Sequence, residues 1–176
     1  VTGQLGFSLV ASGTAEDPTV EGHATVAGLA LGGQALGALQ LTAHTVERAL
    51  VYDFTTRLDS AQLAVHGQTE LRGDYITQAK LDFSHFDVGL IFRLAHLEGI
   101  GAESALAGTA TVQGPLARPG DLRGEVRLQE LAVIVAGVHL QSNGGVHATL
   151  ASNRLTLDPL HVTGDETDLH AQGTLG

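Results

Sequence analysis

The chain has 176 residues but no cysteine and no tryptophan, and its aromatic fraction is only 4%. Without a thiol, catalysis by a cysteine nucleophile and zinc sites built from cysteines are excluded. The apolar fraction is 43% and consists mainly of leucine, valine and alanine. A compact β-sandwich usually fills its core with large aromatic rings, so their scarcity is the first indication of a different architecture.

Basic residues are also scarce, with 9 lysines and arginines against 19 acidic residues and a formal net charge of -10. This balance speaks against nucleic acid as a partner and against electrostatic docking on anionic lipid head groups. No apolar run approaches the roughly 20 residues of a membrane helix, and no signal peptide is recognisable. Because the chain starts at Val1 and stops at Gly176, directly after a strand-like run, we expect a fragment of a longer protein.

Apolar and polar residues alternate along most of the chain, which is the pattern of half-buried β-strands. The longest alternating run, 61–71, would span roughly 36 Å at the rise of an extended chain. Loop lengths indicate that neighbouring strands are nearly all antiparallel. The expected strands are 3–13, 22–31, 39–43, 50–58, 61–71, 75–83, 105–113, 124–135, 137–142, 145–151, 154–163 and 167–175.

Glycine and proline punctuate these runs in a pattern that occurs twice. The turn from Gly114 to Gly124 matches an earlier one from Gly13 to Gly22, which suggests two repeat-like units at about 1–95 and 105–176. The alternation slips by one residue at 27–28 and again at 129–130, and a bulge or bend is needed to keep the apolar side chains on one face. The segments 143–145 and 152–154 are expected to be tight turns between paired strands.

One segment departs from the alternation. Ser84 and Asp87 have the spacing of a helix start, and apolar residues follow at helical intervals from Phe86 to Leu94. We therefore expect a short amphipathic helix near residues 85–94, with a further strand as the alternative. Such a helix would cover apolar strand ends or would gate one end of a groove.

These patterns predict an all-β protein, in which a long, curved, mostly antiparallel sheet runs through residues 1–176 as one continuous unit. The sheet must bury its apolar face by closing, folding over or stacking. Long strands with small aliphatic side chains suit a hydrophobic groove or open tube. A tightly packed sandwich with small side chains is the competing architecture, and the pattern does not choose between them.

The succession of motifs resembles the AsmA-like family of envelope proteins, and in particular its TamB-like branch, the translocation and assembly module subunits. The likeness is carried by segments 108–119 (Gly-Thr-Ala-Thr-Val-Gln-Gly-Pro-Leu-Ala-Arg-Pro), 124–133, 153–164 and 171–176, and with the weaker first unit it covers nearly the whole chain. Each motif is loose, because it consists mainly of glycine and aliphatic alternation. Their order is more specific than any one of them.

The resemblance implies a β-rich groove that extends across the periplasm of a Gram-negative cell from an anchor in the inner membrane. It implies phospholipid acyl chains as ligands, moved between the inner and outer membranes. The TamB-like branch is also linked to the assembly of autotransporters and other outer-membrane β-barrels with an Omp85-type partner, and that anchor and partner-binding end would lie outside this fragment.

No motif indicates an enzyme or a cofactor. Nine histidines are the main candidates for chemistry, and His66, His139, His147 and His170 fall on the polar side of their strands. Imidazoles can bind zinc, but no metal-binding spacing is present, so solvated side chains are the favoured interpretation and no metal is expected. The acidic residues Asp158, Asp165, Glu166 and Asp168 lack the loop pattern of a calcium site and are interpreted as a solvated turn.

The leading hypothesis is therefore a binding and transport module that shelters acyl chains in a curved β groove. Its alternatives are a chaperone-like surface for unfolded outer-membrane strands and a packed structural array without a ligand; a hydrolase ranks last, because no nucleophile constellation is present. The residues expected to line the groove by apolar contact are Leu63, Val65, Leu71, Leu81, Val126, Leu128, Val133, Leu155, Leu157 and Leu169.

Overall fold

In a computed structural model of the chain, the described residues form one open, antiparallel sheet of fourteen strands. The structure describes residues 2–14, 17–31, 34–58, 61–86, 102–104, 106–135, 138–165 and 167–176. The strands are β1 (Thr2–Gly13), β2 (Pro18–Leu31), β3 (Gln34–Val46), β4 (Ala49–Leu58), β5 (Ala61–Glu70), β6 (Ile76–Phe86), β7 (Ala102–Ser104), β8 (Leu106–Pro115), β9 (Arg123–Glu130), β10 (Ala132–Val135), β11 (Val138–Ser142), β12 (Val146–Ala151), β13 (Arg154–Gly164) and β14 (Thr167–Leu175).

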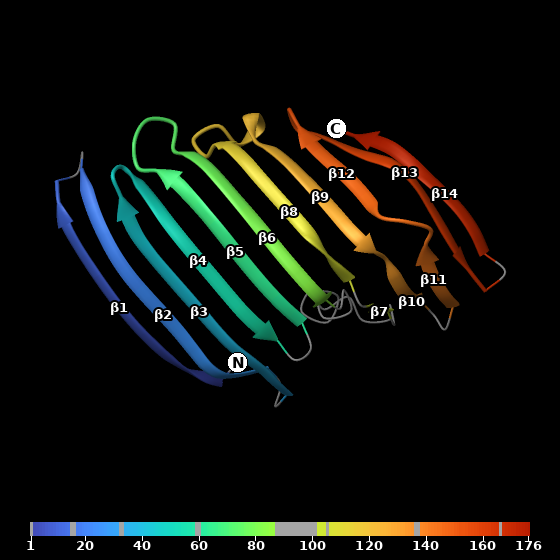
Figure 1. Cartoon of the computed structure of the whole chain (residues 1–176), viewed down its shortest axis with the longest axis horizontal. Coiled ribbons are helices and arrows are strands. Elements are labelled where there is room, and N and C mark those ends of the chain that lie inside the picture. Colours follow the sequence, from blue (N-terminus) through green and yellow to red (C-terminus); the bar gives the residue numbers. More distant parts are fainter. Residues whose placement is uncertain are drawn as a thin grey trace.

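From β1 to β6 each strand pairs with the next one in the sequence, and the order across the sheet then continues with the pairs β6–β8, β8–β9, β9–β12, β12–β13 and β13–β14. Figure 1 shows this meander, with β1 in blue at one edge and β14 in red at the other. The expected all-β class and antiparallel pairing are confirmed. Within the described ranges the single helical element is a 3-10 turn, Pro119–Asp121, between β8 and β9. No helix among these residues is long and apolar enough to span a membrane.

Two long strands of the sheet each contain a break: β9 continues as β10, and β11 continues as β12. β9 pairs with β12 and β10 pairs with β11, so β11 and β12 lie in line along the same neighbouring strand. The break at Leu131 lies opposite segment 143–145, and Ser142 joins the two: its backbone N donates to the Leu131 carbonyl (2.8 Å), and its hydroxyl accepts from the Leu131 N–H (3.0 Å). The expectation of a tight turn at 143–145 is therefore wrong, because this glycine-rich segment is a bulge within one strand.

The turn at 152–154 and the slips in alternation at 27–28 and 129–130 are found where the sequence predicts them. Ser152 and Asn153 both have positive φ, at 52° and 59°, and join β12 to β13 in a two-residue hairpin. The register of β2 against β3 shifts after Val26, and that of β8 against β9 shifts at Gly108. These bulges keep the apolar residues of the following segments on the same face.

The predicted helix start is wrong. Ser84, His85 and Phe86 are the last residues of β6, and the register against β8 shifts between Phe83 and Phe86. His85 has a positive φ of 51°, so the local departure from alternation is a β-bulge. The rest of the predicted helix, 87–94, lies outside the described residues.

Direct cross-strand pairing aligns whole rows of side chains across the sheet. Two neighbouring rows on one face run without interruption from β1 to β14. The first row is Phe7, Ala24, Leu41, Phe54, Val65, Leu81, Ala110, Val126, Ala148, Leu157 and Gly173; the second is Leu9, Gly22, Ala43, Tyr52, Gly67, Ala79, Val112, Gly124, Leu150, Leu155 and Leu175. We call this side of the sheet the apolar face.

The opposite side is the polar face. The row that runs between the two apolar rows on this side contains only polar side chains: Ser8, His23, Thr42, Asp53, His66, Lys80, Thr111, Glu125, Thr149, Thr156 and Thr174. One apolar and one polar face are typical of an antiparallel sheet that buries one side and leaves the other in water.

The apolar face has little cover of its own. Among the described residues only Ala61, Leu106 and Val162 are buried hydrophobic residues. The chain exposes 11339 Å2, whereas a compact protein of 18.2 kDa exposes about 8100 Å2. Stability must therefore come mainly from the backbone ladders and from cross-strand side-chain pairs, each of which contributes about 0.2–1 kcal/mol.

Close backbone approach at Gly108 allows a direct test of this sheet. A Cβ atom there would overlap the carbonyl oxygen of Arg127, whereas nothing lies within 4 Å of a Cβ at Gly173. We predict that Gly108→Ala lowers the free energy of unfolding by about 1–3 kcal/mol, while Gly173→Ala changes it by less than about 1 kcal/mol. Urea denaturation of both variants measures the difference, and equal effects would contradict the register at β8 and β9.

Candidate functional site: an apolar face and a histidine–carboxylate face

The register places the predicted groove residues on one side of the sheet. Nine of them lie in strands and point to the apolar face: Leu63, Val65, Leu81, Val126, Leu128, Val133, Leu155, Leu157 and Leu169. Leu71 follows the end of β5, where its backbone N donates to the Arg48 carbonyl (2.9 Å). Their role in binding a ligand stays a prediction.

Exposure varies along this face. Leu63, Val65 and Leu81 in the middle of the sheet are half-buried by their neighbours, while Leu155 and Leu169 near the β14 edge are 45% and 51% exposed. At the other edge, Leu5, Phe7 and Leu9 of β1 are 67%, 75% and 67% exposed. A patch of this extent is typical of an interaction surface.

Tyrosine at the centre of the face packs over a glycine. A Cβ at Gly67 would meet the ring of Tyr52, so this glycine makes room for the aromatic ring directly across β4 and β5. The Tyr52 hydroxyl lies 3.4 Å from the Thr77 hydroxyl, which lies 2.9 Å from that of Thr69. In a chain with few aromatic side chains, the Tyr52 ring thus covers Gly67 in the middle of the apolar face.

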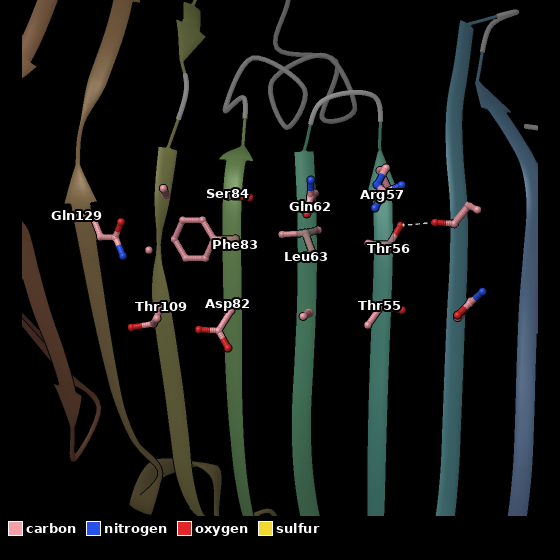
Figure 2. Close-up of a pocket in the computed structure, with 15 residues that line it drawn as sticks. Thr55, Thr56, Arg57, Gln62, Leu63, Asp82, Phe83, Ser84, Thr109 and Gln129 are labelled. Atoms are coloured by element: carbon pink, nitrogen blue, oxygen red, sulfur yellow. Dashed lines mark hydrogen bonds between the residues drawn. The ribbon is translucent and has the colours of Figure 1, made fainter.

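Three open hollows lie on the sheet, with volumes of about 610, 820 and 750 Å3. Each is bordered by two rows of the polar face, and the row between them contributes its backbone as the floor. Figure 2 shows the first hollow, with Arg57, Gln62, Asp82 and Gln129 around it. Leu63 belongs to this floor and Val133 to that of the third hollow.

These hollows are therefore troughs between polar rows. They lie on the polar face, whereas the predicted apolar groove would lie on the apolar face. The chemistry of the two faces divides accordingly: apolar contact on one side, and hydrogen bonds and charge on the other.

Histidines on the polar face pair with carboxylates on neighbouring strands. His66 pairs with Asp53, and His139 lies 3.3 Å from Asp165. The backbone N–H of His139 and its ring both donate toward Asp165, and these hydrogen bonds lower the pKa of that carboxyl. Both imidazoles are exposed, as the sequence predicts, but the alternation gives no sign of the carboxylates that the register sets beside them.

His147 of β12 has the most developed of these contacts. Its Nε2 lies 2.6 Å from Glu125 Oε1 and its Nδ1 lies 2.7 Å from Asp158 Oδ2, so both ring nitrogens face a carboxylate. Hydrogen bonds to Asp158 and then to Glu125 raise the pKa of His147 above 6.5. The hydrogen bond from His147, with Arg127 in support, lowers the pKa of Glu125 below 4.5. The triad thus favours an imidazolium held between two carboxylates.

The acidic residues near the β13–β14 turn do not gather at one point. Asp158 contacts His147, Asp165 contacts His139, and Asp168 contacts His161 and His170. Glu166 lies outside the described residues. Each of these three carboxylates has an imidazole partner and is still at least half exposed, so the acidic residues are solvated as expected and also make cross-strand contacts.

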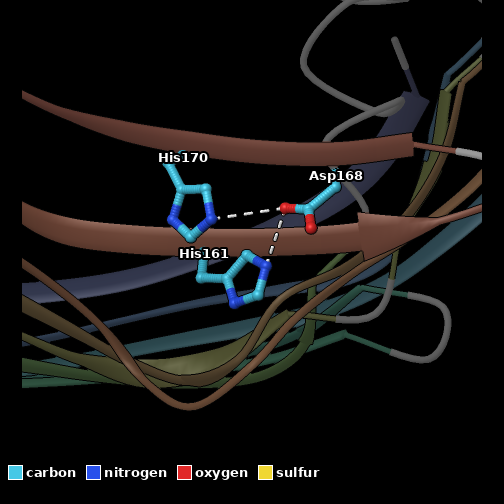
Figure 3. Close-up of side chains that lie close together, drawn as sticks. All are labelled: His161, Asp168 and His170. Atoms are coloured by element: carbon cyan, nitrogen blue, oxygen red, sulfur yellow. Dashed lines mark hydrogen bonds and ion pairs between the residues drawn. The ribbon is translucent and has the colours of Figure 1, made fainter.

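A second cluster joins β13 and β14. His161 and His170 are direct cross-strand partners, and their rings stack with centroids 4.1 Å apart. Both rings face one carboxylate: Asp168 Oδ1 lies 2.8 Å from His161 Nε2 and 3.4 Å from His170 Nε2 (Figure 3). Within the described ranges, this is the group of at least three donors whose ligand atoms all lie within 4.8 Å of one another.

Compared with protein-family models, with curated proteins and with solved structures, the chain matches none.

The His147 triad makes stability depend on pH in a defined direction. The raised pKa of His147 stabilises the fold fully below its unfolded pKa of about 6.5, and this stabilisation is lost as the pH rises through the folded value. The lowered pKa of Glu125 stabilises the fold above its unfolded value of about 4.5, and this stabilisation is lost as the pH falls through the folded value. We predict that His147→Gln destabilises the chain more at pH 6 than at pH 9 in urea denaturation.

Histidine NMR titration checks the cause. The pKa of His147 should lie above 6.5 and should fall in Asp158→Asn, because that substitution removes the carboxylate whose hydrogen bond contributes most to the shift. A His147 pKa at or below 6.5 that does not respond to Asp158→Asn would contradict this assignment.

Proposed function

We propose that the chain is a lipid-sheltering segment of a TamB-like periplasmic protein, whose apolar face holds phospholipid acyl chains during transfer between the inner and outer membranes. The single observation that carries this proposal is the pair of apolar rows that continue without interruption from β1 to β14. Curvature of the sheet around that face into a groove is part of the proposal.

The physical argument concerns what such a face can bind. Acyl chains gain about 0.8 kcal/mol for each methylene removed from water, so a continuous apolar surface competes well for them. The rows contain leucine, valine, alanine, glycine, phenylalanine and one tyrosine, Tyr52, but no charged side chain, so a tail meets no charge along the row. Such a surface binds tails without regard to their identity and lets them slide along the sheet.

The polar face would then remain in water. Its rows contain threonine, histidine, lysine and carboxylates, which stay solvated or pair with one another. Since the chain carries a net charge of -10, attraction of anionic head groups contributes little, and the tails supply the binding energy.

A second candidate function is favoured by one specific observation, the open edge at β1. All twelve residues of this strand are exposed, and their outward backbone groups form a template for another strand. The alternative is a chaperone-like surface that pairs with unfolded strands of outer-membrane proteins and delivers them to an Omp85-type partner.

Site-specific photo-crosslinking in cells distinguishes the two proposals. A benzophenone amino acid at Leu128 would lie on the apolar face, and one at Arg127, the preceding residue of β9, would lie on the polar face. We predict phospholipid adducts at position 128 and none at 127, as read by lipid mass spectrometry. Equal lipid labelling at both positions, or none at 128 in a folded chain, would contradict the lipid proposal.

The edge proposal gives a different labelling pattern. The same photoreactive residue at Val10, which lies on the edge strand and is 62% exposed, should capture outer-membrane proteins if β1 accepts incoming strands. The test is sharpened by Leu9→Pro in the same background: proline removes a backbone donor and should abolish protein adducts while lipid adducts at position 128 persist. Protein adducts that survive this substitution would argue against strand addition at β1.

A further inference from the structure

Two imidazoles and one carboxylate meet on the polar face at the β14 edge, away from the apolar rows. His161 and His170 come from adjacent strands and occupy directly opposed positions, while Asp168 precedes His170 by two residues and lies on the same face of β14. Directly opposed side chains in an antiparallel pair have Cβ atoms only about 4.5–5.5 Å apart, so two histidines here can reach one common point.

From this geometry we propose that His161, Asp168 and His170 bind a divalent transition-metal ion of the Zn2+ type. Nitrogen and oxygen donors of this kind suit Zn2+, whose bonds to imidazole nitrogen and carboxylate oxygen are about 2.0–2.2 Å long. In tetrahedral coordination these lengths put the ligand atoms roughly 3.4 Å from one another. The distance from Asp168 Oδ1 to His170 Nε2 is 3.4 Å, and that to His161 Nε2 is 2.8 Å, so small side-chain rotations complete the site.

The surroundings of the cluster support ligation. Asn143 lies against the remaining ring nitrogen of His161, with 3.3 Å between Nδ2 and Nδ1, and its backbone N donates to the His161 carbonyl (2.8 Å). With the side-chain amide turned so that its oxygen accepts from Nδ1–H, this contact leaves the Nε2 lone pair for the metal, which is the usual outer contact of a metal-bound histidine.

Access is open, since β14 is an edge strand and the side chains of Asp168 and His170 are 68% and 73% exposed, against 34% for His161. The polar face offers other imidazole–carboxylate contacts, but they combine the donors differently. His66 meets the single carboxylate of Asp53, and His147 is already bonded at both ring nitrogens. Among the residues that the structure describes, the β13–β14 cluster is the one in which two imidazoles share one carboxylate.

Isothermal titration with Zn2+ alone tests the proposal on the whole chain. We expect one equivalent to bind, and we expect His170→Ala or Asp168→Asn to weaken the binding at least about tenfold. The matched control is His66→Ala, which removes an exposed imidazole from the same face and should leave the affinity within twofold. Far-UV circular dichroism of each variant confirms that the sheet persists.

A rescue variant separates ligation from structural support. His170→Cys supplies a thiolate in a chain that has no other cysteine, so Zn2+ binding should be retained or tightened. The proposal is overturned if Zn2+ does not bind at one equivalent, if His170→Ala binds as tightly as the parent chain, or if His66→Ala weakens binding equally. Loss of binding in His170→Cys with an intact sheet would also overturn it. None of these outcomes bears on acyl chains, because the cluster lies on the opposite face.

Discussion

Cross-strand register is the constraint on which the rest of this structure depends. A strand has side chains on alternate faces, so one residue of slippage would exchange the apolar and polar faces. The chain avoids this by placing bulges where its alternation slips: after Val26 in β2, at Gln129 in β9 and after Leu157 in β13. As a result, Phe7 on β1 and Gly173 on β14 lie in one apolar row although they are at opposite edges of the sheet (Figure 1).

The two faces are therefore stabilised by different interactions. The apolar face has few buried side chains of its own, so it gains free energy from whatever covers it, and the proposed acyl chains are the simplest such cover. The polar face satisfies its own charges through short cross-strand contacts, with His147 between Glu125 and Asp158 as the strongest example. An imidazole between carboxylates ties β9, β12 and β13 together on the polar face.

Much of this fold can be predicted from the sequence, because period-two alternation determines both the strands and their faces. Strand β5 and the face of Leu63 and Val65 follow directly from the pattern. The pattern fails where a local signal has two structural solutions. Gly144 signals a turn but produces a bulge, and Ser84 signals a helix cap but lies in a bulged strand. The cluster of His161 and His170 could not be predicted, because their pairing depends on the bulge between Leu157 and Leu160.

In the proposed function, one face of this sheet contacts acyl chains and the other does not. Because the chain has no tryptophan, a single tryptophan reports on one position: Leu81→Trp on the apolar face or Lys80→Trp beside it on the polar face of β6. Phospholipid brominated near the end of its acyl chain quenches tryptophan only at short range. We predict strong quenching in Leu81→Trp and little in Lys80→Trp; equal quenching in both variants, or none in a folded Leu81→Trp chain, would rule out a lipid-binding apolar face.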